Sequence, residues 1–208
     1  MQIIESPTKQ KNRKKIVNTS KALFLKNGIG QTTMIDISKA CKMERKTIYN
    51  YFESKELIAE YIFEEVMIKL FNEISSNYDL SGCTTSHEKF KRLFVNIVKS
   101  LFKLKEDIIY TVHYDYFFHN KANPDILSHA MSDFQQKEIY HIINEETKDG
   151  TINLRGQEPL EIFSMLGQAI MAFASRMFFR GHIIEEETGL KEEELYQYVD
   201  ILMDGIKS

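Results

Sequence analysis

The sequence predicts an all-α fold, with an N-terminal three-helix head that contains a helix-turn-helix and a helical body behind it. Only 3 prolines and 9 glycines interrupt 208 residues, and these are the two poorest helix formers. Apolar side chains recur at helical spacing along most of the chain, and no segment alternates convincingly as a strand would. We place the head at residues 1–56 and the body at residues 57–208.

Two helices are expected at the start of the head. The first should run from about residue 9 to residue 27, where Gly28 supplies the stop. Thr33 is a candidate N-cap for the second, and Asp36 stands three residues later, as a capping box requires. These two signals favour a helix, a turn and a second helix.

A third, shorter helix is predicted between Glu44 and Phe52. Helices under about 12 residues are marginal on their own, so this one must be held by packing, through Ile48 and Phe52. Its other side chains are then free to point away from the protein. They are Arg45, Lys46, Tyr49 and Asn50.

Two close helices, the second rich in hydrogen-bonding groups, are typical of a helix-turn-helix that lays its second helix in the DNA major groove. Arg or Lys pairs with guanine and Asn with adenine, while Thr and Tyr reach phosphates or a thymine methyl. The pattern therefore predicts double-stranded DNA as a partner.

The first 60 residues or so resemble the DNA-binding region of the tetracycline-repressor (TetR) family. One ungapped pattern carries the resemblance: Ile16, Ser20 (usually Ala), Leu23, Phe24, Gly28, Thr33, Ile37, Ala40, residues 47–52 and residues 54–57. It implies DNA contacts from the matching positions. With the helix N-cap, the predicted contact residues are Thr33, Arg45, Lys46, Thr47, Tyr49, Asn50, Tyr51 and Lys55.

Two positions depart from the family pattern. Lys42 stands where glycine is usual, at a cost on the order of 1 kcal/mol if the backbone is left-handed there. Glu44 replaces the usual Ser or Thr at the start of the third helix; it is a poorer N-cap and would repel a phosphate. Arg45 and Lys46 are expected to compensate.

The net charge of −3 hides a strong asymmetry between the two parts. Residues 1–57 hold 12 Lys and Arg against 5 Asp and Glu, a net +7, and residues 58–208 hold 15 against 25, a net −10. A basic head on an acidic body is the footprint of a DNA-binding module joined to a regulatory one. The competing interpretation is that the basic run near the N-terminus is a solvated tail.

The body should be a succession of helices. The expected elements are a long helix after Ser54, a loop at residues 77–86, a helix from residue 87 to about 120 broken near 104–106, a helix from residue 123 to near 150, a turn at residues 156–159, a helix over residues 160–181, an acidic loop at residues 185–187, and a last helix over residues 192–206.

The helix at residues 160–180 is apolar nearly all round, so it must be covered on more than one side. With the stripe of the last helix, it predicts a homodimer through a four-helix interface, the arrangement that the resemblance also implies. The candidate interface residues are Leu166, Ile170, Phe173, Met177, Leu195, Val199 and Leu202. The alternative is a core helix within one chain.

An aromatic-dense helix end near residues 110–119 predicts one wall of a pocket for a small-molecule effector of unknown identity, since ligand pockets are mostly apolar and aromatic. Candidate lining residues are Tyr110, His113, Tyr114, Phe117, Met131, Phe134, His141 and Phe163. For each ring taken singly, ordinary core packing is the competing interpretation.

An enzyme is not expected, and no catalytic residue, metal site or cofactor is predicted. Glu138 and His141 have the Glu-x-x-His spacing of di-iron helices, but that site needs two such pairs. Asp115 and His119 share a helix face, which favours a surface hydrogen bond over a metal. The chain has neither a glycine-rich phosphate loop nor a nucleophile signature.

The remaining composition is that of a soluble cytoplasmic protein. Cys41 and Cys83 have no metal-ligand spacing and suit a reducing compartment. No apolar run approaches the roughly 20 residues that cross a bilayer, and the N-terminus is polar and basic rather than signal-like.

We therefore expect a ligand-responsive regulator, a repressor by the resemblance, whose dimer reads two half-sites of a palindromic operator about 34–36 Å apart. The alternative is a helical ligand- or protein-binding module without operator binding. Lys42 and Glu44 favour this alternative because they depart from the family pattern.

Overall fold

The computed structural model describes residues 6–77, 79–120, 143 and 148–208. Within these ranges the regular elements are α-helices and one 3-10 turn, and the extended backbone is limited to an isolated bridge between Ile152 and Lys207. The expected all-α fold is confirmed.

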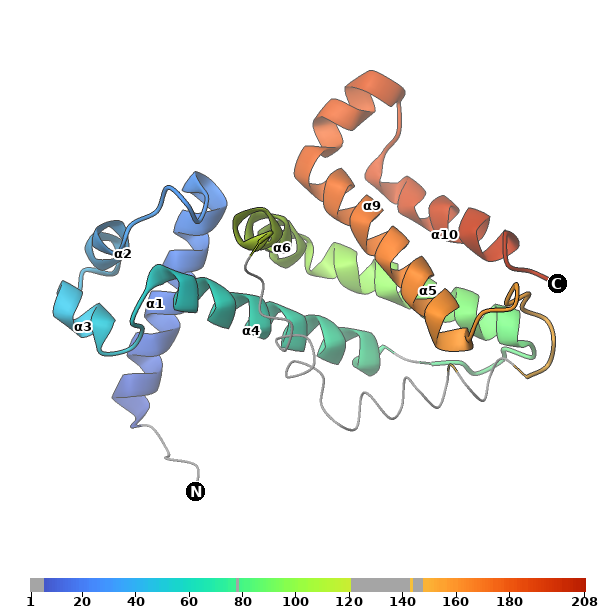
Figure 1. Ribbon diagram of the computed structural model, residues 1–208, viewed down its shortest axis with the longest axis horizontal. Helices are drawn as coiled ribbons and strands as arrows, with labels where there is room; N and C mark the ends of the chain where they lie inside the picture. Colours follow the sequence, from blue (N-terminus) through green and yellow to red (C-terminus); the bar gives the residue numbers. More distant parts are fainter. Residues whose placement is uncertain (1–5, 78, 121–142, 144–147) are drawn as a thin grey trace.

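The head contains α1 (Pro7–Asn27), α2 (Met34–Cys41) and α3 (Arg45–Tyr49). Proline at the first position of α1 suits a helix start, because its missing N–H would have had no partner there. Gly28, with φ 80°, ends α1 where the sequence predicted. Figure 1 shows α2 and α3 next to each other on the same side of α1.

The long helix α4 (Lys55–Ser76) leaves the head and runs along the body (Figure 1). The Ser54 hydroxyl accepts a hydrogen bond from the Leu57 amide, as expected of an N-cap. The expected domain boundary falls within the first turn of α4, and α4 packs on α1 as well as on α5 and α6. A continuous helix, rather than a loose linker, joins head to body.

The body contains α5 (Ser86–Lys103), α6 (Lys105–Phe118), α9 (Pro159–Thr188), a 3-10 turn (Glu192–Glu194) and α10 (Leu195–Asp204). The predicted break near residue 104 is confirmed, because Leu104 has φ −107° and ψ 24° between α5 and α6. The helix expected from residue 123 lies mostly outside the described residues.

The acidic loop predicted at residues 185–187 is wrong, because α9 continues through it to Gly189. The expected end near Gly181 is instead a kink, with Arg180 at φ −129°. Glutamate is a good helix former, and the next left-handed glycine, Gly189, provides the stop.

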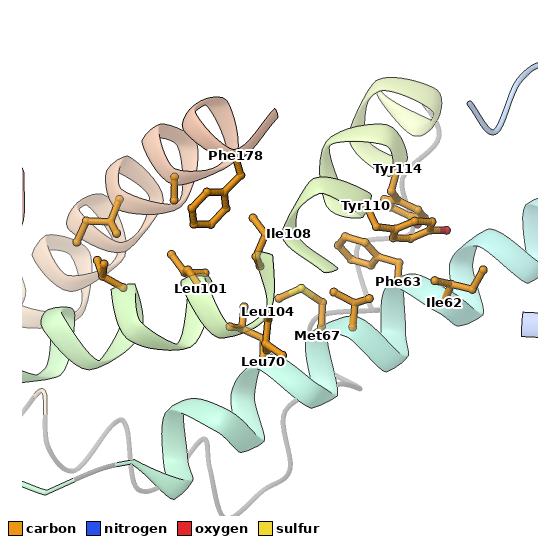
Figure 2. Packing of buried hydrophobic residues seen from close by; sticks show 14 of the residues in the cluster. Ile62, Phe63, Met67, Leu70, Leu101, Leu104, Ile108, Tyr110, Tyr114 and Phe178 are labelled. Carbon is orange, nitrogen blue, oxygen red and sulfur yellow. The ribbon is translucent and has the colours of Figure 1, made fainter. Parts of the chain in front are cut away.

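One continuous core joins the body helices (Figure 2). Side chains of α4, such as Met67 and Leu70, pack against Leu101 and Leu104 at the end of α5 and Ile108 at the start of α6. The head shares this cluster through its own buried side chains, which include Ile16, Phe24, Ile37 and Ile48. α6 therefore touches both parts of the molecule.

By length and composition alone, α9 could cross a membrane. It packs against α5, α6 and α10, and Leu166, Ile170 and Ala174 are buried. The core helix of a soluble protein satisfies the same criterion.

Candidate DNA-binding surface and the joint behind it

The third helix is five residues long and is held from behind. Ile48 is completely buried and Phe52 nearly so, both within the core cluster. The Phe52 amide donates to the Ile48 carbonyl at 3.0 Å, which continues the helical turn beyond Tyr49. This packing supplies the stability that so short a helix lacks by itself.

The opposite side of α3 is polar and exposed. Arg45, Lys46, Tyr49 and Asn50 all reach solvent. The Arg45 guanidinium lies 5.8 Å from the centre of the Tyr49 ring and 3.5 Å from its hydroxyl. The two longest side chains of this face therefore support each other, and the orientation predicted from the sequence is confirmed.

Thr47 and Tyr51 lie at the edge of this face and are half-buried. The Tyr51 hydroxyl accepts a hydrogen bond from the Asn12 amide of α1 at 3.1 Å. The Arg13 guanidinium lies 6.0 Å from the Tyr51 ring centre. Tyr51 thus ties α1 to the end of α3, and its hydroxyl keeps a proton to donate.

The two departures from the family pattern have the geometry that the sequence suggested. Lys42 is left-handed, at φ 52° and ψ 47°, and closes α2 where a glycine would be free of strain. Glu44 makes no side-chain capping bond at the start of α3. Arg45 and Lys46 follow it directly, so two cations begin the exposed face.

Thr33 forms the predicted capping box with Asp36. Its Oγ1 accepts from the Asp36 amide at 3.2 Å and donates to the Asp36 carboxylate at 2.6 Å. The hydrogen bonds that the Thr33 hydroxyl and the Thr33 backbone amide donate to this carboxylate lower the pKa of Asp36. Thr33 is exposed, but its hydroxyl proton already has an acceptor within the head.

Lys55 makes contacts within the chain that the sequence did not predict. Its ammonium donates to the carbonyls of Ile29, Gly30 and Thr32 at 2.8–2.9 Å. An ammonium has three protons, so none remains for a phosphate. We assign Lys55 to holding the α1–α2 connection against α4.

A buried carboxylate that the sequence did not reveal lies between head and body. Asp107 of α6 accepts hydrogen bonds from Lys21 of α1 and from Lys69 of α4, the latter at 2.6 Å. Burial favours the neutral acid, but the two ammonium groups outweigh it and lower the pKa of Asp107. The only sequence signal was an acidic residue in the first turn of a helix, which is too common to single out.

The predicted pocket residues that the structure describes have different surroundings. The Tyr110 hydroxyl donates to the Ala59 carbonyl at 2.9 Å, the Tyr114 ring stacks on Phe63 with centroids 4.0 Å apart, and Phe163 stacks on Phe94. Burial raises the pKa of Tyr110, and burial, with nearby carboxylates, raises that of Tyr114 to about 12. Two of the predicted residues that the structure describes, His113 and Phe117, line the same cavity. The remaining three lie outside the described residues: Met131, Phe134 and His141.

The predicted dimer residues divide into two groups. Five are buried within a single chain: Leu166, Ile170, Met177, Leu195 and Val199. Phe173 and Leu202 are half-buried, and the Phe173 ring packs 4.7 Å from that of Tyr198, centre to centre. The five therefore belong to the core of one chain, where α9 packs on α5 and α6 and α10 packs on α5 and α9.

The geometry of the described residues does not support the metal sites that the sequence analysis considered. Among the described residues, no group of three His, Cys, Asp or Glu side chains is placed to hold a metal ion. His119 bonds instead to the Tyr116 carbonyl at 3.0 Å and to the Asn120 amide at 2.7 Å. Glu138 and His141 fall outside the described residues.

Residues 16–62 match the sequence model of the family described as "Bacterial regulatory proteins, tetR family". A curated relative is the HTH-type dhaKLM operon transcriptional activator DhaS of Lactococcus lactis subsp. lactis (strain IL1403). It is 35% identical over 66 residues, which span 32% of this chain and 35% of that protein.

Solved structures extend the likeness to the whole chain at the level of fold. A bacterial regulatory protein of the tetR family from Rhodococcus RHA1 superposes with a TM-score of 0.67 at 13% identity, covering 95% of this chain and 97% of that one. A TetR-family transcription regulator from Marinobacter aquaeolei VT8 gives 0.62 at 15% identity, with coverages of 97% and 98%. The ketosteroid transcriptional regulator KstR2 of Mycobacterium tuberculosis gives 0.57 at 13% identity, with coverages of 100% and 97%.

Residues 16–62 therefore match the DNA-binding region of the tetR family of bacterial regulatory proteins, and the chain as a whole shares its fold with solved structures of that family.

Proposed function

We propose that the protein is a cytoplasmic, dimeric, one-component transcriptional regulator, with a reading head at residues 1–56 and a regulatory body at residues 57–208. The observation that carries the proposal is the exposed face of α3, where Arg45, Lys46, Tyr49 and Asn50 surround a helix held from behind by Ile48. Two such faces, about 34–36 Å apart, would read the half-sites of a palindromic operator.

Charge supports the same function. The +7 of residues 1–57 attracts the phosphate backbone, while the −10 of the remainder keeps the body away from it. We expect repression where the operator overlaps a promoter. The curated relative is named an activator. The same DNA binding would allow activation where the operator lies upstream of the promoter.

The dimer is proposed to form through the outer faces of α9 and α10. These helices pack together, and each leaves an apolar side chain in solvent on its free flank: Met165 is 57% exposed and Ile201 is 68% exposed. Burying such side chains against a second copy is favourable. This face replaces the inward stripe that the sequence predicted.

DNA binding is tested by selecting double-stranded DNA from a random pool with the purified protein and measuring the affinity of the winning sequence by fluorescence anisotropy. Lys46→Ala should weaken binding and reduce the steepness of its salt dependence, and Tyr49→Ala should weaken it by about 1–3 kcal/mol. Lys99→Ala removes the same charge from an exposed site on α5 and should change little. If no palindrome is selected, or if all three variants bind DNA with the same affinity, the alternative function is favoured: a helical binding module without operator binding.

The dimer is tested by analytical ultracentrifugation of Met165→Glu and Ile201→Glu. Both charges should shift the protein toward monomer and weaken operator binding, because a single head loses the second half-site. Glu at Leu57, an exposed apolar position on α4, is the matched control. Unchanged sedimentation of the two α9 and α10 variants would place the interface elsewhere.

A further inference from the structure

A cavity of about 420 Å³ lies at the joint between head and body. One wall is the connection between α1 and α2 (residues 27–31); the other is formed by α6 and by Phe179 of α9. Figure 1 shows α6 between the head and α9, so this cavity borders the head, α6 and α9 at once. Its volume lies within the roughly 300–1,000 Å³ of small-molecule sites.

The lining of this joint cavity defines the chemistry of an occupant. Val112, Phe117 and Phe179 supply apolar and aromatic surface, and the lining residues that the structure describes include no Asp, Glu, Lys or Arg. His113 packs edge-on against Phe179, with ring centres 5.5 Å apart. Burial lowers its pKa, so at neutral pH the imidazole offers one donor and one acceptor. A neutral ring would find aromatic partners here.

The walls of the joint cavity contact the segment that leads into the reading head. A methyl group at Gly30 would lie 3.8 Å from two carbons of the Phe117 ring, so α6 and the α1–α2 connection are already in close approach. The Lys55 ammonium lies 5.5 Å from the centre of the same ring while it holds the Ile29, Gly30 and Thr32 carbonyls. A molecule against Phe117 therefore bears on the segment that leads directly into α2.

We propose that the joint cavity is a regulatory site for a small, neutral, ring-containing molecule with one hydrogen-bonding group, and that filling it changes the affinity of the head for DNA. The regulatory half rests on the DNA binding proposed above; the binding half stands on the cavity alone. The ligand acts only if it binds the DNA-competent and DNA-incompetent arrangements unequally.

The binding half is tested with the neutral fluorescent probe N-phenyl-1-naphthylamine and the full chain. The probe should bind saturably to the wild type. Val112→Trp should weaken it by about tenfold or more, because the indole fills the cavity. Val95→Trp, the same change on α5 away from the joint, should leave the affinity unchanged. Phe179→Ala, at a position that is 45% exposed, should also weaken it and covers the case in which Val112→Trp fails to fold.

The regulatory half is tested by repeating the operator titration with saturating probe. The operator dissociation constant should change by about fivefold or more in the wild type and in Val95→Trp, and not in Val112→Trp. Probe binding that is absent, or that is equal in the wild type, Val112→Trp and Phe179→Ala, overturns the site while leaving the operator function intact. A probe affinity that falls as the protein dimerises would show that a second copy fills the cavity, and would overturn it too.

Operator binding that the probe leaves unchanged overturns only the regulatory half. A protein that binds the probe in a Val112-dependent way but selects no DNA keeps the site, and it is the proposed operator function that fails.

Discussion

In the head, α2 and α3 are 8 and 5 residues long, whereas α9 in the body runs for 30. α2 begins at a local signal, the Thr33 capping box, and both short helices leave their polar faces in solvent. The long one is fixed by partners far away in the sequence and buries its apolar stripe on α5, α6 and α10. A reading head must expose hydrogen-bonding groups on a firm support, while a regulatory body must keep its apolar surface covered.

The largest effect should come from truncating Ile48, the most deeply buried side chain behind the reading helix. Ile48→Ala leaves a cavity behind α3 and should lower the free energy of unfolding by about 2–5 kcal/mol. Ile108→Ala, an equally buried side chain of α6, should cost a similar amount. Urea unfolding followed by circular dichroism measures both, and operator titration separates them.

At temperatures where both variants remain folded, Ile48→Ala should lose operator binding, because a five-residue helix depends on this contact. Ile108→Ala should retain it. Normal operator binding by Ile48→Ala would contradict the proposed difference between head and body.

The next effect concerns the ion pair that joins the regions. Asp107→Asn removes the charge that Lys21 and Lys69 share and should lower stability at pH 7 by about 1–3 kcal/mol. Asp200→Asn, in an exposed pair with Lys91, should cost less than about 1 kcal/mol. Chemical denaturation at fixed pH measures both.

The sign of the pH dependence follows from the lowered pKa of Asp107. Its contribution is present above the unfolded pKa near 4 and is lost as the pH falls through the lower folded value. The stability gap between wild type and Asp107→Asn should therefore close on acidification below about pH 4. A gap that stays constant between pH 7 and pH 3 would show that Asp107 does not act as a buried ion.

A capping box in each region gives a matched pair of smaller effects. Thr33 caps α2 with Asp36, and Thr85 caps α5 with Glu88 in the same geometry. Thr33→Ala and Thr85→Ala should each cost about 1 kcal/mol of stability in thermal or urea unfolding. Only Thr33→Ala should also weaken operator binding, since it loosens the helix that positions α3. Equal loss of DNA affinity in both variants would mean that the body transmits such changes to the head.

The smallest effect should be a gain. Lys42→Gly relieves a left-handed lysine and should raise the free energy of unfolding by up to about 1 kcal/mol. Arg155 is also left-handed, but its guanidinium donates to the Gly205 carbonyl at 2.6 Å, so Arg155→Gly should gain less or lose stability. Differential scanning calorimetry of the two variants decides, and a gain in Arg155→Gly that equals the head variant's would contradict this account.

The sequence by itself determined the reading helix. Gly28, the Thr33–Asp36 capping box, the left-handed Lys42 and the division between buried Ile48 and exposed Arg45 are all decided within a few residues. Caps and helical periodicity are local physical signals, and they remained valid in the structure.

Only the tertiary structure decided which side of α9 lies inside, where the cavity lies, and what Lys55 and Asp107 do. Lys55 reaches carbonyls 23–26 residues away, and Asp107 meets a lysine 86 residues away. An apolar helix shows which residues avoid water but not which neighbour covers them, and a single charge does not reveal its partner. These features depend on which distant segments pack together, and no local pattern encodes that.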